Sequence, residues 1–127
     1  MRTVVALIFA LLISGLTSSA QAAGKLHHVV CLKFKSTAST QDIKQVEEAF
    51  MALKEKIPGI ENVKWGTNVS KEQKNKGFTH CFLLTFKSDK ERDVYLEHPD
   101  HKAFAKLVGP FVDDVFVIDF VTNKKEK

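Results

Sequence analysis

A phenol and two imidazoles lie within seven residues, in the segment Tyr95-Leu96-Glu97-His98-Pro99-Asp100-His101. An imidazole can take and return a proton near neutral pH, and a phenol can donate a hydrogen bond to a developing oxyanion. Pro99 ends any helix that runs into it and is well placed to begin a new one. The segment therefore predicts a helix junction that carries proton-transfer groups.

The same residue types also have a purely structural interpretation. A histidine beside a proline, such as His98, can be only a helix cap, and Tyr95 can be a core aromatic whose hydroxyl is hydrogen-bonded. A buried histidine on a strand is more often a hydrogen-bonded core residue than a catalyst. The residue types alone leave both interpretations open.

Periodic patterns predict the elements that position this segment. Alternating polarity predicts strands at residues 26–34, 60–69, 78–86 and 115–121. An apolar stripe at helical spacing predicts a helix that begins near Thr40 and stops at Pro58. A second helical stretch is capped by Ser88 and broken at Pro99.

The first and third predicted strands carry two further histidines on apolar faces. His28 shares a face with Val30, and His80 shares a face with Phe82. The opposite face of the third strand is also largely uncharged, so the sheet needs a cover on both sides. The expected α+β architecture is a ferredoxin-like βαββαβ fold with a four-stranded antiparallel sheet, paired with a second copy as a dimeric α/β-barrel.

The start of the chain has the layout of a secretory signal peptide. A positive Met1-Arg2 precedes an apolar run at residues 4–13, and small residues end in Ala20-Gln21-Ala22. The apolar run is short for a membrane span. The expected organisation is a signal peptide at residues 1–23 and one domain at residues 24–127, exported to the periplasm or secreted, with no stable membrane anchor after cleavage.

The charge pattern limits the partners. The formal net charge is +4, and the lysines are scattered or lie in residues 71–76 and 124–127, so no nucleic-acid partner is expected. Four histidines come from strands and helix ends without a standard ligand spacing, so neither a metal site nor a cofactor is expected. They are His28, His80, His98 and His101.

The two cysteines leave two interpretations open. Cys31 and Cys81 both point away from the predicted helix face, on strands that are antiparallel neighbours in a ferredoxin-like sheet. An oxidising compartment would allow a cross-strand disulfide. Two small buried thiols in the dimer core are the alternative, which the demanding geometry of a disulfide favours.

Six short motifs follow one another along most of the chain. They are His28-Val29-Val30-Cys31-Leu32-Lys33-Phe34-Lys35, Ile57-Pro58-Gly59-Ile60, Val63-Lys64-Trp65-Gly66, Gly77-Phe78-Thr79-His80, Tyr95 to His101, and Val117-Ile118-Asp119-Phe120. In this order they resemble the stress-responsive α/β-barrel (Dabb) family of dimeric ferredoxin-like domains. The resemblance implies the fold and a homodimer, and it says much less about activity because many members have no assigned reaction.

One member of that family, the plant polyketide cyclase that forms olivetolic acid, uses a histidine base with a tyrosine partner between sheet and helices. The resemblance places the base on His101 and its partner on Tyr95. The expected substrate-binding residues are His28, His80, Val30, Phe82, Phe50 and Phe104. The chain departs from the cyclase at Val46, Glu47, Ala105 and Val112, which implies a pocket of different shape.

Three functions are consistent with these residues. The first is an exported Dabb-domain dimer that binds a small apolar or aromatic ligand without an assigned reaction. The second is an enzyme that abstracts a proton next to a carbonyl, with His101 as a base kept neutral by the helix N-terminus and Tyr95 as hydrogen-bond donor. The third, borrowed from other dimeric α+β barrels, is a monooxygenase-like activity. An exported protein would not meet cytosolic acyl-CoA intermediates, which argues against the cyclase's own substrate.

Overall fold

The computed structural model describes residues 24–123. Its elements are β1 (Leu26–Phe34), α1 (Thr40–Lys56), β2 (Ile60–Thr67), β3 (His80–Phe86), α2 (Asp89–Glu97), α3 (Pro99–Val108), the short 3-10 helix η1 (Gly109–Phe111) and β4 (Val112–Val121). The predicted βαββαβ order is confirmed, with the second helix divided at Pro99. The predicted signal peptide, residues 1–23, lies outside the described residues.

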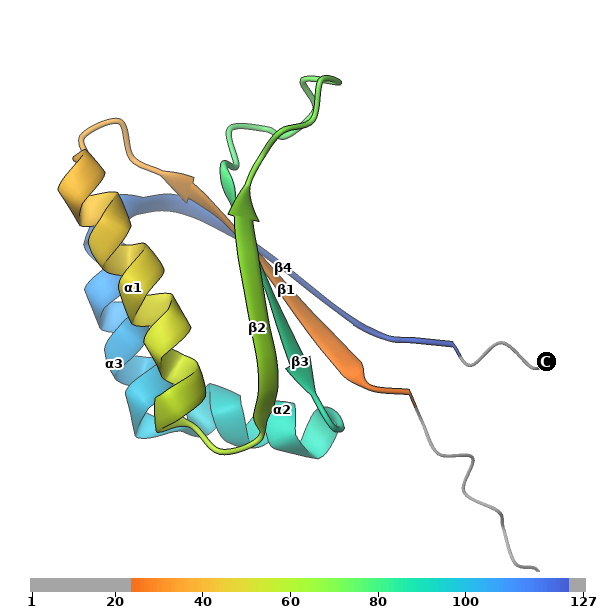
Figure 1. Cartoon of the computed structure of the whole chain (residues 1–127). Coiled ribbons are helices and arrows are strands. Elements are labelled where there is room, and N and C mark those ends of the chain that lie inside the picture. The colour runs from red at the N-terminus through yellow and green to blue at the C-terminus, as the bar shows by residue number, and fades with distance from the viewer. Residues whose placement is uncertain (1–23, 124–127) are drawn as a thin grey trace, which may run out of the picture.

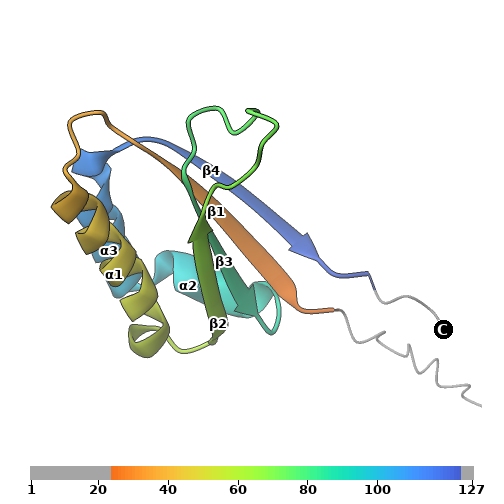
Figure 2. The same cartoon turned by 45° about the horizontal axis from the view of Figure 1, so that its top comes forward.

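The four strands form one antiparallel sheet in the order β2-β3-β1-β4. The helices lie on one face of this sheet and leave the other face open, as Figure 1 shows. The loop between β2 and β3 projects beyond the end of the sheet (Figure 2). This is the predicted ferredoxin-like fold. None of the helices in residues 24–123 is long and apolar enough to cross a membrane.

Helix α1 begins and ends where its sequence requires. The Ser39 side chain accepts a hydrogen bond from the Asp42 N–H at 3.0 Å, and the Asp42 carboxylate accepts one from the Ser39 N–H at 2.9 Å, which completes a capping box. Gly59 reverses the chain after the helix with a φ of 98°, a conformation that costs glycine little. One stripe of α1 is thereby directed onto the sheet; its buried residues are Val46, Phe50 and Leu53.

The junction between α2 and α3 is made by His98 and Pro99. His98 has extended backbone angles, and its Nδ1 accepts a hydrogen bond from the Asp100 N–H at 3.1 Å. Pro99 occupies the first turn of α3, where its missing N–H leaves no hydrogen bond unmade. His98 is therefore the helix cap that the structural interpretation of the sequence anticipated.

Stacked aromatic rings hold the helices on the sheet. The rings of Phe50 from α1 and Phe82 from β3 lie 3.9 Å apart at 4°, and Phe104 from α3 meets Phe50 edge-on at 4.8 Å. Phe82 is fully buried, with 0% of its surface exposed. This cluster connects three elements that are far apart in the sequence.

Three strand boundaries differ from the prediction. Strand β2 ends at Thr67 and β3 begins at His80, two residues short of the predicted strand on each side, although the Asn68 N–H still donates to the Thr79 carbonyl at 2.8 Å. Strand β4 begins earlier than predicted, at Val112, directly after η1.

A bulge in β2 changes which of its residues face the core. The pairing with β3 shifts between Ile60 and Asn62, so Ile60 and Val63 are both buried although three positions separate them. Strict alternation would place these two residues on opposite faces.

Replacing Phe82 with alanine tests the aromatic cluster. Removal of this fully buried ring should lower the free energy of unfolding by about 3 to 5 kcal/mol. Urea unfolding followed by circular dichroism measures the change. Val69→Ala, at a loop position that is 88% exposed, is the control and should change the stability by less than about 0.5 kcal/mol. Equal stability of the two variants would contradict the assignment of Phe82 to the core.

Candidate functional site

A cavity of about 590 Å³ lies between the sheet and the helices α2 and α3. Its walls are mainly apolar, and its apolar residues include Val30, Leu32, Phe50, Phe104, Val108 and Val112. The polar side chains of its lining include His28 from β1, Tyr95 from α2, His101 from α3 and Asp119 from β4. The cavity thus gathers titratable groups from four elements between largely apolar walls.

The structure brings together most of the side chains that the sequence nominated. The residues that line the cavity are His28, Val30, Phe50, Tyr95, His101 and Phe104. Phe82 lies beneath its stacking partner Phe50 and does not reach the cavity surface. Ala105 and Val112, which depart from the cyclase pattern, are wall residues, whereas Val46 is packed in the core.

His80 lies outside this cavity because of the strand register. His28 pairs with Leu84, whereas His80 pairs with Leu32, so the two histidines are four positions apart along the sheet, about 13 Å. The ring of His80 is instead engaged by Glu47 of α1, whose carboxylate lies 2.8 Å from Nε2. Glu47 is therefore a hydrogen-bond partner of His80 and does not line the cavity.

His101 is oriented as a proton acceptor. Its Nδ1 lies 3.2 Å from the backbone carbonyl of Leu96. A carbonyl can only accept, so in the neutral ring the proton is on Nδ1 and the lone pair is on Nε2. Burial is the largest cause and lowers the pKa of His101 below its ordinary value of 6.5, although the hydrogen bond to the Leu96 carbonyl acts in the opposite direction. His101 is consequently a neutral base at neutral pH, for which burial is the main physical cause.

Tyr95 is oriented as a proton-bearing donor. Only 1% of its surface is exposed, and burial raises its pKa well above the ordinary value, so the hydroxyl keeps its proton. Its ring lies 4.4 Å from that of His101 and 5.7 Å from that of His28. In the described part of the chain no fully enclosed side-chain N or O lacks a hydrogen-bond partner, and the Tyr95 hydroxyl bonds to no residue there. The hydroxyl is therefore not fully enclosed, and Tyr95 is one of the residues that line the cavity.

A chain of charged hydrogen bonds runs behind His28. His28 Nδ1 donates to Asp119 Oδ1 at 2.6 Å, and Arg92 Nη1 donates to Asp119 Oδ2 at 2.8 Å. Burial opposes ionisation of Asp119, but the hydrogen bonds from Arg92 and His28 hold its pKa below the ordinary value. Sequence reasoning missed Asp119 and Arg92 as site residues. The available signal was a lone carboxylate in the apolar strand Val117-Ile118-Asp119-Phe120.

The charge of the lining limits what the cavity can hold. No lysine or arginine lines it, and its acidic residues are Asp113, Asp114 and Asp119. Lys33 pairs with Asp113 at 3.5 Å and Arg92 pairs with Asp119 at 2.8 Å, both from outside the lining. Across residues 24–123, no group of three His, Cys, Asp or Glu side chains is placed to hold a metal ion. The arrangement can accept and donate protons to a neutral molecule, and it offers no cation to an anionic one.

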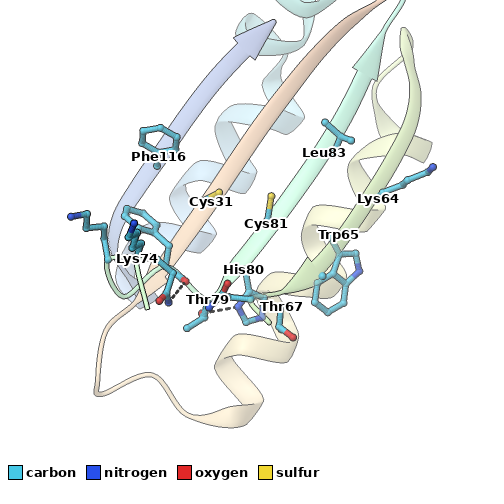
Figure 3. A pocket seen from close by; sticks show the side chains of 15 residues that line it. Cys31, Lys64, Trp65, Thr67, Lys74, Thr79, His80, Cys81, Leu83 and Phe116 are labelled. Carbon is cyan, nitrogen blue, oxygen red and sulfur yellow. Dashed lines mark hydrogen bonds between the residues drawn. The ribbon is translucent and has the colours of Figure 1, made fainter. Parts of the chain in front are cut away.

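A second cavity of about 570 Å³ lies on the open face of the sheet. Figure 3 shows Cys31 and Cys81 side by side on adjacent strands, with Phe116 on the same face. The two cysteines are direct cross-strand partners, as the predicted topology required, and both thiols are free. Burial raises the pKa of Cys31 to about 11, and Cys81 adds to the effect.

Known proteins resemble the chain over almost all of its described length. The profile of the Stress responsive A/B Barrel Domain (Dabb) matches residues 26–122. The stress-response A/B barrel domain-containing protein HS1 of Arabidopsis thaliana is 33% identical over 100 residues, which are 79% of this chain and 92% of that protein. Olivetolic acid cyclase of Cannabis sativa is 28% identical over 97 residues, 76% of this chain and 96% of the cyclase.

Solved structures share the fold. A hydroxynitrile lyase from Passiflora edulis superposes with a TM-score of 0.75 at 26% identity, covering 82% of this chain and 98% of the lyase. A dimeric ferredoxin-like protein of unknown function from Jannaschia sp. CCS1 superposes with a TM-score of 0.67 at 26% identity. This superposition covers 76% of this chain and 98% of the Jannaschia protein.

The lowered pKa of His101 predicts a pH-dependent part of the stability. The folded state favours the neutral ring, so this contribution is fully present above the ordinary value of 6.5 and is lost as the pH falls below it. Unfolding free energies of wild type and His101→Gln, measured across this range, should diverge at high pH and converge at low pH. The carboxylate of Asp119 affects the stability in a separate, more acidic pH range. A difference between the two proteins that appears only in that range would contradict the prediction.

Proposed function

The chain belongs to the Stress responsive A/B Barrel Domain (Dabb) family, and on this premise we propose that it binds a small neutral carbonyl compound and abstracts a proton next to the carbonyl. His101 is the base and Tyr95 is the hydrogen-bond donor. The observation that carries the proposal is the meeting of one acceptor and one donor in a single apolar cavity. Family membership by itself assigns no reaction.

The two side chains have complementary proton states. His101 Nε2 holds a lone pair because Nδ1 is engaged with the Leu96 carbonyl, and Tyr95 holds its proton because burial disfavours the phenolate. Removing a proton from a carbon next to a carbonyl requires a base that takes the proton and a donor that stabilises the negative charge developing on the carbonyl oxygen. The ring separation of 4.4 Å lets both side chains reach one bound molecule.

In the proposed step, His101 Nε2 takes the proton from carbon and the C–H electron pair forms the enolate double bond. The carbonyl oxygen gains the charge and accepts a hydrogen bond from the Tyr95 hydroxyl. The apolar walls lower the local dielectric constant and so strengthen this hydrogen bond. The imidazolium of His101 then returns its proton to the enolate or to a later intermediate, which restores the neutral base.

The cavity indicates the size and charge of the ligand. Its volume of about 590 Å³ is in the range of small-molecule sites. The absence of lysine and arginine from its lining, together with Asp113 and Asp114, opposes anionic groups such as carboxylates and phosphates. The phenyl rings of Phe50 and Phe104 offer contacts to an alkyl or aromatic substituent.

Two named relatives support the proposal. One protein with this fold is an olivetolic acid cyclase and another is a hydroxynitrile lyase, so enzymes occur among the proteins that this chain resembles. HS1 and the Jannaschia protein carry no reaction in their names. For this reason the geometry of His101 and Tyr95 carries the argument, and the relatives only agree with it.

The proposal includes a homodimer closed through the open face of the sheet. The half-exposed apolar side chains of β4 include Phe116, Ile118 and Phe120, whose strand partners in β1 place them on the face without helices. A contiguous apolar surface of this kind is typical of protein interfaces. The dimeric Jannaschia protein supports a second copy as the covering element.

Deuterium uptake at carbon tests the chemistry. Wild-type protein in heavy water should exchange protons next to the carbonyl in neutral alkyl ketones and β-diketones, followed by proton NMR. His101→Gln should reduce the rate by about a hundredfold to ten-thousandfold, the usual contribution of a general base, while ligand binding persists. Tyr95→Phe should also reduce the rate, and the exposed Lys102→Gln on α3 is the control. If the wild-type protein binds these ketones without exchanging their protons, the proposed enzyme activity is wrong and the protein is a ligand-binding protein.

Light scattering after size exclusion tests the dimer. Wild type should have the mass of two chains, and Ile118→Asp should have the mass of one because a carboxylate on the open face opposes burial. Val94→Asp places the same charge on an exposed position of α2 and should leave the dimer intact. A monomeric wild type would contradict the proposal.

A further inference from the structure

His28 is a second acceptor in the cavity, and the proposed proton abstraction does not use it. Only 4% of its surface is exposed, and it lines the cavity beside Tyr95. Its Nδ1 is engaged by Asp119, whereas Nε2 bonds to no described residue. Within residues 24–123, every fully enclosed side-chain nitrogen or oxygen has a hydrogen-bond partner. Because Nε2 has no such partner, it is not fully enclosed and stays accessible from the cavity.

The partner of Nδ1 determines what Nε2 can do. The Asp119 carboxylate only accepts hydrogen bonds, so the His28 proton must be on Nδ1. In the neutral ring the lone pair is then on Nε2 and faces the cavity. His28 therefore offers an acceptor there, as His101 does, and Tyr95 is the donor of the set.

We propose that Arg92 and Asp119 are positioning residues that hold His28 as a hydrogen-bond acceptor, and that the ligand of this cavity carries a hydroxyl group in addition to its carbonyl. The inference rests on the proposed function for the carbonyl and adds the hydroxyl. The ligand class is a neutral β-hydroxy ketone or an enolised β-diketone. Its carbonyl oxygen accepts from Tyr95, its acidic carbon faces His101 and its O–H donates to His28.

The loss of water from His28 on binding makes the site selective for a ligand with a hydroxyl group. The Nε2 atom of a buried His28 loses water when a ligand fills the cavity, so a ligand without a donor leaves it without a hydrogen bond. Sites built to pair with a hydroxyl reject the analogue that lacks it far more strongly than apolar sites reject an added methylene. A hydroxyl is therefore the feature that this end of the cavity selects.

Arg92 determines how the carboxylate can be replaced. Its guanidinium only donates, and its Nη1 lies 2.8 Å from Asp119 Oδ2. In Asp119→Asn the amide oxygen must face Arg92, which turns the amide NH₂ toward His28 Nδ1. His28 then has to accept at Nδ1 and carry its proton on Nε2, so the acceptor in the cavity becomes a donor.

Removing the guanidinium as well should reverse this change. In the double variant Arg92→Met/Asp119→Asn, nothing holds the amide oxygen on the far side, and it can accept from His28 Nδ1 again. In the single variant Arg92→Met the carboxylate remains, so His28 keeps the wild-type tautomer. These four proteins separate an effect on the His28 proton from a general loss of structure.

The first measurement is the ring-nitrogen NMR spectrum of His28 at neutral pH. Wild type, Arg92→Met and the double variant should show the proton on Nδ1, and Asp119→Asn should show it on Nε2. The second is the affinity for a β-methoxy ketone, which accepts but cannot donate at that position, and for its β-hydroxy counterpart, which does both. Wild type should prefer the hydroxy compound by about tenfold to a hundredfold; Asp119→Asn should lose the preference, and the double variant should regain it.

Three results would overturn the inference: an imidazolium at His28 in wild type at neutral pH, an unchanged tautomer in Asp119→Asn, or equal affinity of wild type for the two compounds. Neither measurement depends on turnover. A protein that binds the hydroxy compound selectively but exchanges no protons would refute the proposed reaction and leave the hydroxyl site established.

Discussion

The candidate site depends on the break in the helix at Pro99. In an uninterrupted helix, side chains six residues apart point about 120° away from each other around the axis, so Tyr95 and His101 would not face one space. The extended backbone of His98 and the proline after it start a new helix in a new direction, and the two rings then meet at 4.4 Å. The same turn leaves the Leu96 carbonyl available to fix the His101 tautomer.

The sheet is apolar on both faces, and the protein uses the faces differently. Helices cover one face and leave a cavity with acidic residues and no lysine or arginine in its lining. The open face has its own cavity, whose lining includes Lys64, Lys74 and Lys76 and whose floor contains the Cys31–Cys81 pair. The absence of lysine and arginine from the helix-side lining is the reason why a neutral ligand is proposed for that side.

Inside the helix-side cavity, hydrogen-bond partners decide the role of each polar group. A carbonyl behind His101 and a carboxylate behind His28 hold the Nδ1 proton of each ring, and burial keeps the proton on the Tyr95 hydroxyl. Arg92 shares the carboxylate with His28 and thus neutralises a charge that would otherwise be isolated near an apolar cavity. Roles that residue types leave ambiguous become definite once the partners are known.

The sequence by itself determined the order of elements, the ferredoxin-like fold and the helix junction, because periodicity and breakers such as Pro99 act locally. Most of the side chains around the cavity were predicted from the resemblance to the Dabb family. The sequence also placed Cys31 opposite Cys81 through topology. Only the tertiary structure separated His80 from His28, since that depends on strand register, and only it revealed Asp119 and Arg92, whose contacts span 91 and 27 residues of chain. Local sequence patterns do not show which distant residues come into contact. Hydrogen bonds between such residues determine the proton states on which the candidate chemistry depends.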